Sequence, residues 1–161
     1  MQPIRDPQPS ARAAAALLGT RWIVRAPIWA YRARLGALFG SRLVLLEHRG
    51  RVSGARRYVV LEVVATPGPN TVVVASGFGA RAQWYRNIQV DPHVRVTRGS
   101  HRSRPALARA LDSQQSADAL GRYARAHPRA WRRLRPVFEA TLGTPITDQH
   151  TDLPLVAFDL R

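Results

Sequence analysis

The chain contains no cysteine and no lysine among its 161 residues. Without cysteine there is no disulfide, no thiolate nucleophile and no cysteine-based zinc or iron–sulfur site. Without lysine, Schiff-base chemistry and a P-loop lysine are excluded as well. The 5 histidines show no paired metal-ligand spacing, so we expect no metal site. These absences exclude several classes of covalent and metal-dependent enzyme.

Acidic residues are also scarce, with Asp+Glu 10 against 25 cationic residues that are all arginine, for a net charge of +15. Such a surface suits polyanions, which include nucleic acid, anionic lipid and a phosphorylated cofactor. Part of the charge can equally be a solvated face. The aromatic residues (Trp 4, Tyr 4, Phe 4) do not alternate with arginine along any expected strand, as base-stacking platforms do. This pattern argues against a nucleic-acid binder.

Long hydrophobic runs are missing too. The apolar run Ala13 to Leu18 is too short to span a bilayer, and residues 2–12 lack the pattern of a signal peptide. We expect a disordered tail over 1–12 and one domain over 13–161 that begins with a helical arm, 13–40. Tryptophan and arginine in the arm suit a membrane interface, or a helix packed on its own domain. We therefore expect a cytoplasmic protein, and peripheral membrane contact through the arm remains an alternative.

Short apolar runs separated by glycine- and proline-rich turns dominate the rest of the chain. They predict six strands, mostly in hairpin succession, with a short helix before Asp91-Pro92 and two helices late in the chain. The expected strands are 43–48, 58–65, 71–76, 93–98, a segment from Ser100 to about Leu111, and 153–160. We therefore expect an α+β fold, a mainly antiparallel six-stranded β-barrel with N-terminal and late helices packed on it.

The first hairpin has an enlarged tip bracketed by Gly50 and Gly54. Glycine there allows a backbone with positive φ, which exposes N–H groups in one concavity. Guanidinium groups match phosphate or carboxylate in a bidentate manner, so the tip is a candidate anion site. An ordinary exposed turn in an arginine-rich chain is the alternative. The polar side chains at the tip are Arg49, Arg51, Ser53, Arg56 and Arg57.

Four further residues stand out from their surroundings. Trp84 and Asn87 share a helical spacing and are expected in the core and in bracing a loop. His48, at a strand end, is expected to be partly exposed. Glu62 interrupts an apolar strand, and either pairs with an arginine across the barrel or, the preferred interpretation, faces solvent.

Four motifs in order resemble the deazaflavin-dependent nitroreductase family of actinobacteria. They are Gly50-Arg51-Val52-Ser53-Gly54-Ala55-Arg56-Arg57, Val73-Val74-Ala75-Ser76-Gly77-Phe78-Gly79, Trp84-Tyr85-Arg86-Asn87-Ile88 with Asp91-Pro92-His93-Val94, and Leu153-Pro154-Leu155-Val156. The likeness spans roughly Leu43 to Phe158. It implies a split β-barrel of the kind that also binds FMN, an oxidoreductase that uses reduced coenzyme F420, and hydride transfer to a quinone, nitro compound or other activated acceptor.

The resemblance also implies roles for individual residues. Ser76, which ends a central strand in the family pattern, is the candidate catalytic proton donor. The coenzyme would bind the hairpin tip by its phosphate and anionic tail, and the loop after Ser76 by its ring. The residues so assigned are Arg49, Arg51, Ser53, Gly54 and Arg57 for the tail, and Ser76, Gly77, Phe78 and Gly79 for the ring. The tyrosine cluster over the acceptor is reduced to Tyr123, with His127 and Trp131 nearby in sequence.

This sequence departs from the family pattern in the segment before the tip, where many members carry threonines and this chain has Glu47, His48 and Arg49. The loop between Ser76 and Trp84 is also shorter than in the best-known nitroreductases of the family. Two alternatives therefore stay open: an FMN-binding reductase, and a non-catalytic barrel that carries a fatty acid or a heme-like ligand. An oligomer is compatible with either.

Overall fold

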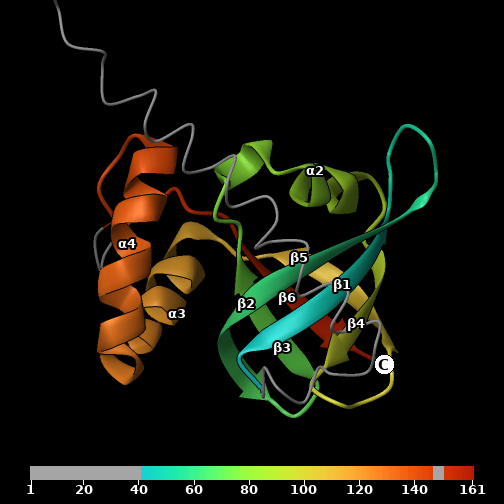
Figure 1. The fold of residues 1–161 in the computed structure, drawn as a ribbon, viewed down its shortest axis with the longest axis horizontal. Helices are drawn as coiled ribbons and strands as arrows, with labels where there is room; N and C mark the ends of the chain where they lie inside the picture. The colour runs from blue at the N-terminus through green and yellow to red at the C-terminus, as the bar shows by residue number, and fades with distance from the viewer. Residues whose placement is uncertain (1–40, 147–150) are drawn as a thin grey trace, which may run out of the picture.

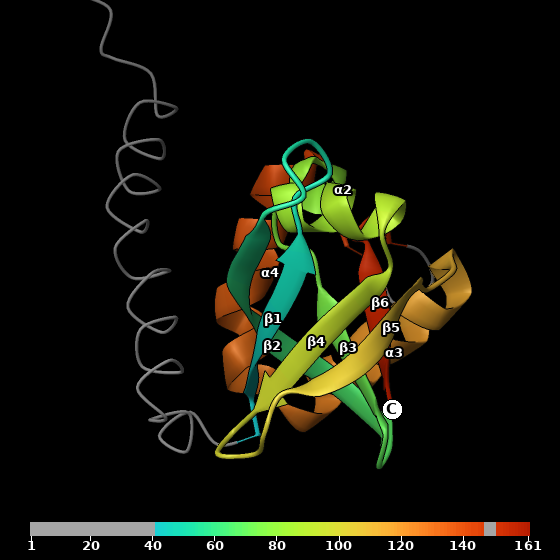
Figure 2. The same cartoon turned by 90° about the vertical axis from the view of Figure 1, so that its right-hand side faces the viewer.

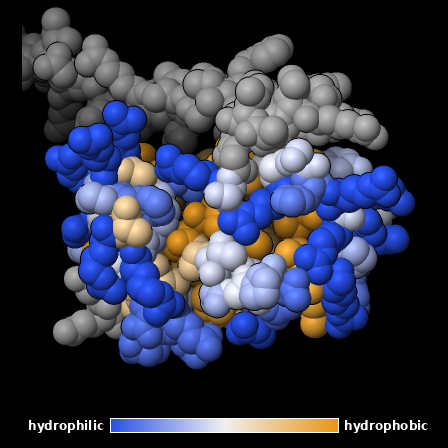
Figure 3. Space-filling model, turned by 90° about the horizontal axis from the view of Figure 1, so that it is seen from below, coloured by the Kyte–Doolittle hydropathy of each residue, from blue (hydrophilic) through white to orange (hydrophobic). Residues whose placement is uncertain are grey.

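The computed structural model describes residues 41–146 and 151–161. The expected tail 1–12 and helical arm 13–40 lie outside these residues, and so does the membrane contact that was considered as an alternative for the arm. In the described part of the chain no helix is long and apolar enough to cross a membrane. Its surface is largely hydrophilic, with hydrophobic side chains visible between the late helices and the barrel when the molecule is seen from below (Figure 3).

Six antiparallel strands close into a barrel in the order β1-β2-β3-β6-β5-β4, which confirms the expected fold class (Figures 1 and 2). The strands are β1 (Leu43–Arg49), β2 (Arg56–Gly68), β3 (Thr71–Ala75), β4 (His93–Arg98), β5 (Arg104–Ala110) and β6 (Leu155–Leu160). The fifth and sixth strands begin a few residues later than expected, since a turn occupies Gly99 to Ser100 and irregular chain precedes Leu155. The first hairpin pairs Val44 with Leu61 and Leu46 with Val59. These residues alternate along their strands and pack in the apolar barrel interior.

Helix α2 (Gln83–Val90) covers one end of the barrel, on the same side as the tip of the β1–β2 hairpin (Figures 1 and 2). Its Trp84 and Ile88 belong to the core of the barrel. The helix ends at Asp91, before Pro92, as the sequence predicts. This end of the molecule therefore brings the tip and α2 together above the core.

Helices α3 (Ser113–Ala126) and α4 (Pro128–Leu142) form a second layer on the outside of the barrel (Figure 1). Asp112 caps α3 with a capping box to Gln115, and Gly143 ends α4 in the left-handed region at φ 75°. A second core lies beneath the two helices, where Leu120 of α3 packs with Val73 of β3 and Leu155 of β6. A short 3-10 helix, η2 (Gly79–Arg81), precedes α2.

Candidate functional site

The tip of the first hairpin, residues 50–55, is a well-defined turn. The Gly50 N–H donates to the Ala55 carbonyl (2.8 Å), and the Gly54 N–H donates to the Gly50 carbonyl (2.7 Å). Gly54 has φ +65°, which L side chains rarely adopt, so a glycine is favoured there. The Ser53 hydroxyl accepts from the Ala55 N–H (3.3 Å). The backbone of the tip is therefore held in a fixed shape.

Two side chains of α2 anchor this tip to the barrel end. Asn87 Oδ1 accepts from the Arg51 backbone N–H (3.1 Å) and from Arg51 Nη1 (3.0 Å). Arg51 Nη1 also donates to Gln83 Oε1 (2.9 Å). Asn87 and Trp84 are both buried. The prediction that these two residues serve in the core and in bracing a loop is confirmed.

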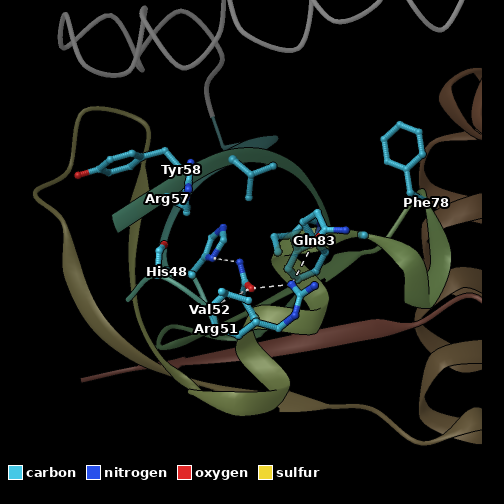
Figure 4. A pocket seen from close by; sticks show the side chains of 13 residues that line it. His48, Arg51, Val52, Arg57, Tyr58, Phe78 and Gln83 are labelled. Atoms are coloured by element: carbon cyan, nitrogen blue, oxygen red, sulfur yellow. Dashed lines mark hydrogen bonds between the residues drawn. The ribbon is translucent and has the colours of Figure 1, made fainter. Parts of the chain in front are cut away.

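A cavity of about 500 Å³ lies between the tip, the start of β2, α2 and Phe78. In Figure 4, Phe78 lies across the cavity from Arg57 and Tyr58, and Arg51 reaches Gln83 from below. The lining residues are His48, Gly50, Arg51, Val52, Ser53, Arg57, Tyr58, Val59, Phe78, Ala82, Gln83, Trp84 and Asn87. The lining therefore combines two arginines and neutral polar groups with aromatic and aliphatic side chains.

The cavity carries positive charge without a carboxylate to balance it. None of its lining residues, all within the described part of the chain, is Asp or Glu, while Arg51 and Arg57 contribute two guanidinium groups. A Cβ placed on Gly50 would lie 3.1 Å from the Ser53 hydroxyl and 3.7 Å from Arg57 Nε. The absence of a side chain at residue 50 thus keeps an open cradle beside Ser53 and Arg57. An anion could occupy it.

His48 forms part of the wall of this cavity. It is 5% exposed and pairs in register with Arg57 across the hairpin. Burial lowers the pKa of His48 below its ordinary value, the Arg57 charge lowers it further, and a backbone hydrogen bond with Arg49 acts in the opposite direction. The expectation of a partly exposed histidine was wrong. At residue 48 the strand pleat points inward, and α2 covers that end of the barrel.

The residues assigned to the coenzyme tail separate into two groups. Arg51, Ser53 and Arg57 line the cavity, and Gly54 shapes the tip without lining it. Arg49 lines a separate hollow of about 200 Å³ that His48 also borders. Neighbouring residues on a strand point to opposite faces, which separates Arg49 from its neighbour at 48.

Of the residues assigned to the ring, Ser76 and Gly79 are buried, Gly77 is partly buried and Phe78 is exposed. Ser76 is fully buried, and its hydroxyl donates to the Gly79 carbonyl (2.7 Å). A Cβ on Gly77 would lie 3.1 Å from Phe138, and one on Gly79, where φ is +62°, would lie 3.3 Å from Leu142. These glycines allow the loop to pack closely on α4. Phe78 alone of this group lines the cavity.

Tyr123, His127 and Trp131 form an aromatic cluster elsewhere. The Tyr123 ring lies 5.1 Å from that of His127 and 6.5 Å from that of Trp131, between centroids. Tyr123 and His127 line a different hollow, of about 490 Å³, between α3 and β2. The structure therefore does not bring the three residues assigned to the acceptor to the cavity at the tip.

Glu62 explains how the Tyr123 side chain is held. It accepts a hydrogen bond from the Tyr123 hydroxyl and pairs with Arg42 Nη2 at 3.1 Å. Burial, followed by the hydrogen bond and charge of Glu62, raises the pKa of Tyr123 to about 12. Glu62 therefore pairs with an arginine, although Arg42 directly precedes the adjacent strand and does not lie across the barrel, and the Glu62 side chain keeps 28% exposure.

Four cavity residues, Tyr58, Val59, Ala82 and Gln83, were missed from the sequence. For Gln83 a signal existed, since it precedes Asn87 by four positions and so shares its helix face. For Val59, alternation with the buried Leu61 placed it on the inward face of β2. Tyr58 and Ala82 carried no comparable signal.

The fold of the barrel assigns the protein to a structural class. A solved protein of the pyridoxinephosphate oxidase family from Clostridium acetobutylicum has the same fold, with a TM-score of 0.51 at 9% identity over 82% of this chain and 83% of its own. An F420-H2 dependent reductase, FDR-A, also matches, with a TM-score of 0.51 at 23% identity over 73% of this chain and 94% of its own. These neighbours make the protein a split barrel.

The family follows from the sequence. Residues 23–135 match the model of the F420H(2)-dependent quinone reductase family. A Mycobacterium tuberculosis (strain ATCC 25618 / H37Rv) protein, provisionally named as such a reductase, is 40% identical over 88 residues, which is 52% of this chain and 72% of its own. The chain belongs to this family of oxidoreductases, whose name implies reduced coenzyme F420 and a quinone. The resemblance drawn from the four motifs is confirmed.

Proposed function

We propose that the cavity beside the tip binds coenzyme F420 and that the protein transfers a hydride from the reduced coenzyme to a quinone. The observation that carries this proposal is the cavity of about 500 Å³, whose lining has no carboxylate and combines two arginines with aromatic and aliphatic side chains. A ligand with an anionic tail and a flat ring matches both kinds of group. Family membership supplies the cofactor class.

The residues present fit such a ligand. The phosphate and anionic tail would bind Arg57 and the outer edge of the Arg51 guanidinium, beside the Ser53 hydroxyl. A charge-assisted hydrogen bond of this kind contributes about 1.5–3 kcal/mol. Trp84, Phe78 and other apolar groups would hold the ring. When bound, the coenzyme supplies the hydride, and the task of the protein is to fix the ring and exclude water.

The acceptor would approach from the side at which Phe78 lies. Phe78 is 56% exposed and lines the cavity opposite Arg57, so it borders both the cavity and solvent. A quinone, a nitro compound or another flat activated acceptor could stack there. Tyr123, His127 and Trp131 are left out of this proposal because they border a different hollow.

A proton-donating role for Ser76 would require a local rearrangement. Its hydroxyl donates to the Gly79 carbonyl within the protein and has no exposure. To give a proton to bound ligand, the serine would have to leave that carbonyl. We therefore propose that Ser76 acts first by holding the loop that carries Phe78.

A titration with oxidised coenzyme F420, followed by fluorescence at two salt concentrations, tests the proposal. We expect saturable binding that weakens at high salt, since the arginine contacts are electrostatic. Turnover with a soluble quinone and reduced coenzyme then tests hydride transfer. FMN serves as the competing ligand, and a protein that purifies yellow with bound flavin would contradict the assignment. Absence of coenzyme binding at both salt concentrations, by folded protein, would overturn it.

A further inference from the structure

A chain of hydrogen bonds joins three elements at the floor of the cavity. It runs from His48 at the end of β1 to Asn87 on α2, and from Asn87 to Arg51 in the tip (Figure 4). His48 Nδ1 lies 3.2 Å from Asn87 Nδ2. His48 also lines the cavity, although the proposed function gives it no contact with the ligand. His48 is therefore a feature of this chain whose role the proposed function leaves unexplained.

The direction of these bonds fixes the state of the imidazole. Both groups of Arg51 that reach Asn87, the backbone N–H and Nη1, can only donate. The amide oxygen must therefore face Arg51, and the amide nitrogen must face His48. Because that nitrogen also donates, His48 Nδ1 has to accept. The ring is then neutral and carries its proton on Nε2.

Burial makes the loss of any hydrogen bond in this chain costly. His48 and Asn87 are each 5% exposed, so water does not readily replace a lost partner. His48 and Asn87 line the cavity together with Trp84 of α2, and Val94 lines the neighbouring hollow that His48 also borders. The charged neighbour of His48 across the hairpin is Arg57, and a backbone hydrogen bond with Arg49 acts in the opposite direction by favouring the protonated ring. An imidazolium would face a donor at Asn87 and a cation at Arg57. Both neighbours favour the neutral ring.

We propose that His48 is a positioning residue for anion binding: as a neutral acceptor it holds the Asn87 amide in the one orientation that fixes Arg51 at the cavity. Nη1 of Arg51 is taken by Asn87 and Gln83, so the rest of the guanidinium is left for an anion. Removal of the acceptor at residue 48 frees the amide to rotate, and Arg51 loses its anchor. The inference rests on the proposed function for the identity of the anion.

A pair of substitutions at residue 48 separates the effect of the hydrogen-bond acceptor from the effect of side-chain volume. His48→Asn places an amide oxygen near the position of Nδ1 and retains an acceptor for Asn87, but has nothing at Nε2. His48→Leu keeps similar volume and offers no acceptor. We expect coenzyme affinity within about threefold of wild type for His48→Asn, and about tenfold weaker binding for His48→Leu, the loss of one fixed hydrogen bond. Equal weakening in both variants would overturn the proposal.

A second measurement needs no coenzyme. Nitrogen-15-labelled histidine in the intact protein reports by NMR which ring nitrogen carries a proton, and the signal that disappears in His48→Asn identifies residue 48. We expect Nδ1 without a proton and Nε2 with one at neutral pH. A proton on Nδ1, or an imidazolium, would overturn the proposal. If wild-type protein fails to bind the coenzyme, the proposed function fails, while this experiment still decides whether His48 is the neutral acceptor for Asn87.

Discussion

Two polar networks of this molecule each contain an arginine, and the two arginines have partners of different charge. In the tip network, Arg51 is held by the neutral side chains of Asn87 and Gln83. In the α3 network, Arg42 is paired with the carboxylate of Glu62, which also accepts from Tyr123. The first network borders the cavity at the barrel end, and the second lies between β2 and α3.

The difference shows which arginines of a strongly cationic chain are available to a ligand. A carboxylate partner cancels the charge of a guanidinium, whereas amide partners fix its position and leave the charge in place. Arg57 also lies in the cavity, where no described lining residue carries a negative charge. Uncancelled charge that lines a cavity beside a fixed guanidinium, more than the net charge of +15, therefore supports the proposed binding site.

Among the variants considered, removal of Arg57 should have the largest effect on coenzyme binding. We expect Arg57→Ala to weaken coenzyme binding by roughly 10- to 150-fold, which corresponds to about 1.5–3 kcal/mol for a charge-assisted hydrogen bond. Arg42→Ala removes the same charge from the α3 network and is the matched control. Its affinity should be that of wild type. Equal affinities for wild type and Arg57→Ala, measured by fluorescence titration, would contradict the assignment of the tip.

Ser76→Ala tests whether a hydroxyl that is hydrogen-bonded inside the protein, like that of Tyr123, contributes to stability more than to coenzyme binding. Ser76→Ala removes the side-chain donor to the Gly79 carbonyl, which still accepts from the Ala82 N–H (3.3 Å), so the free energy of unfolding should fall by up to about 1.5 kcal/mol. Urea unfolding measures this, and coenzyme affinity should change little. A loss of turnover with unchanged stability and affinity would instead support a proton donor.

Much of this architecture could be predicted from local sequence. Short apolar runs between turns predicted the strands, and the proline after Asp91 predicted the end of α2. The tip was predicted as an anion site because glycines and arginines lie together in one short turn. These features depend on neighbours in sequence, and for that reason a single chain reveals them.

What could not be predicted depends on contacts between distant segments. The burial of His48 requires α2 to cover the barrel end, and the buried place of Ser76 requires α4 to pack on its loop. Tyr123 was assigned to the acceptor from the family resemblance, yet its partner Glu62 lies 61 residues away. Spacing along the chain does not determine which wall of a barrel a helix covers.

Loss of the tyrosine hydroxyl should give a smaller effect, confined to the α3 network. Tyr123→Phe removes the hydrogen bond to Glu62, whose side chain keeps 28% exposure and still pairs with Arg42. Water can therefore replace the lost donor, and we expect a decrease of about 1 kcal/mol in the free energy of unfolding. Coenzyme affinity should not change. A large loss of affinity would show that the two networks are coupled.

The two networks should also weaken at opposite ends of the pH range. Because burial lowers the pKa of His48 from 6.5, the unfolded chain takes up a proton first as pH falls below 6.5, and stability is lost in that window. The pKa of Tyr123 is raised from 10.0 to about 12, so the unfolded chain ionises first above pH 10 and stability is lost as pH rises toward 12.

Urea unfolding of wild type, His48→Asn and Tyr123→Phe across this range separates the two contributions. His48→Asn should show a shallower acid decline than wild type, because the proton acceptor of the unfolded chain is gone, and should keep the alkaline decline. Tyr123→Phe should show the reverse. If both variants followed the wild-type curve at both ends, neither side chain would titrate differently on folding, and the contrast between a neutral acceptor at the tip and a charged acceptor under α3 would lose its electrostatic basis.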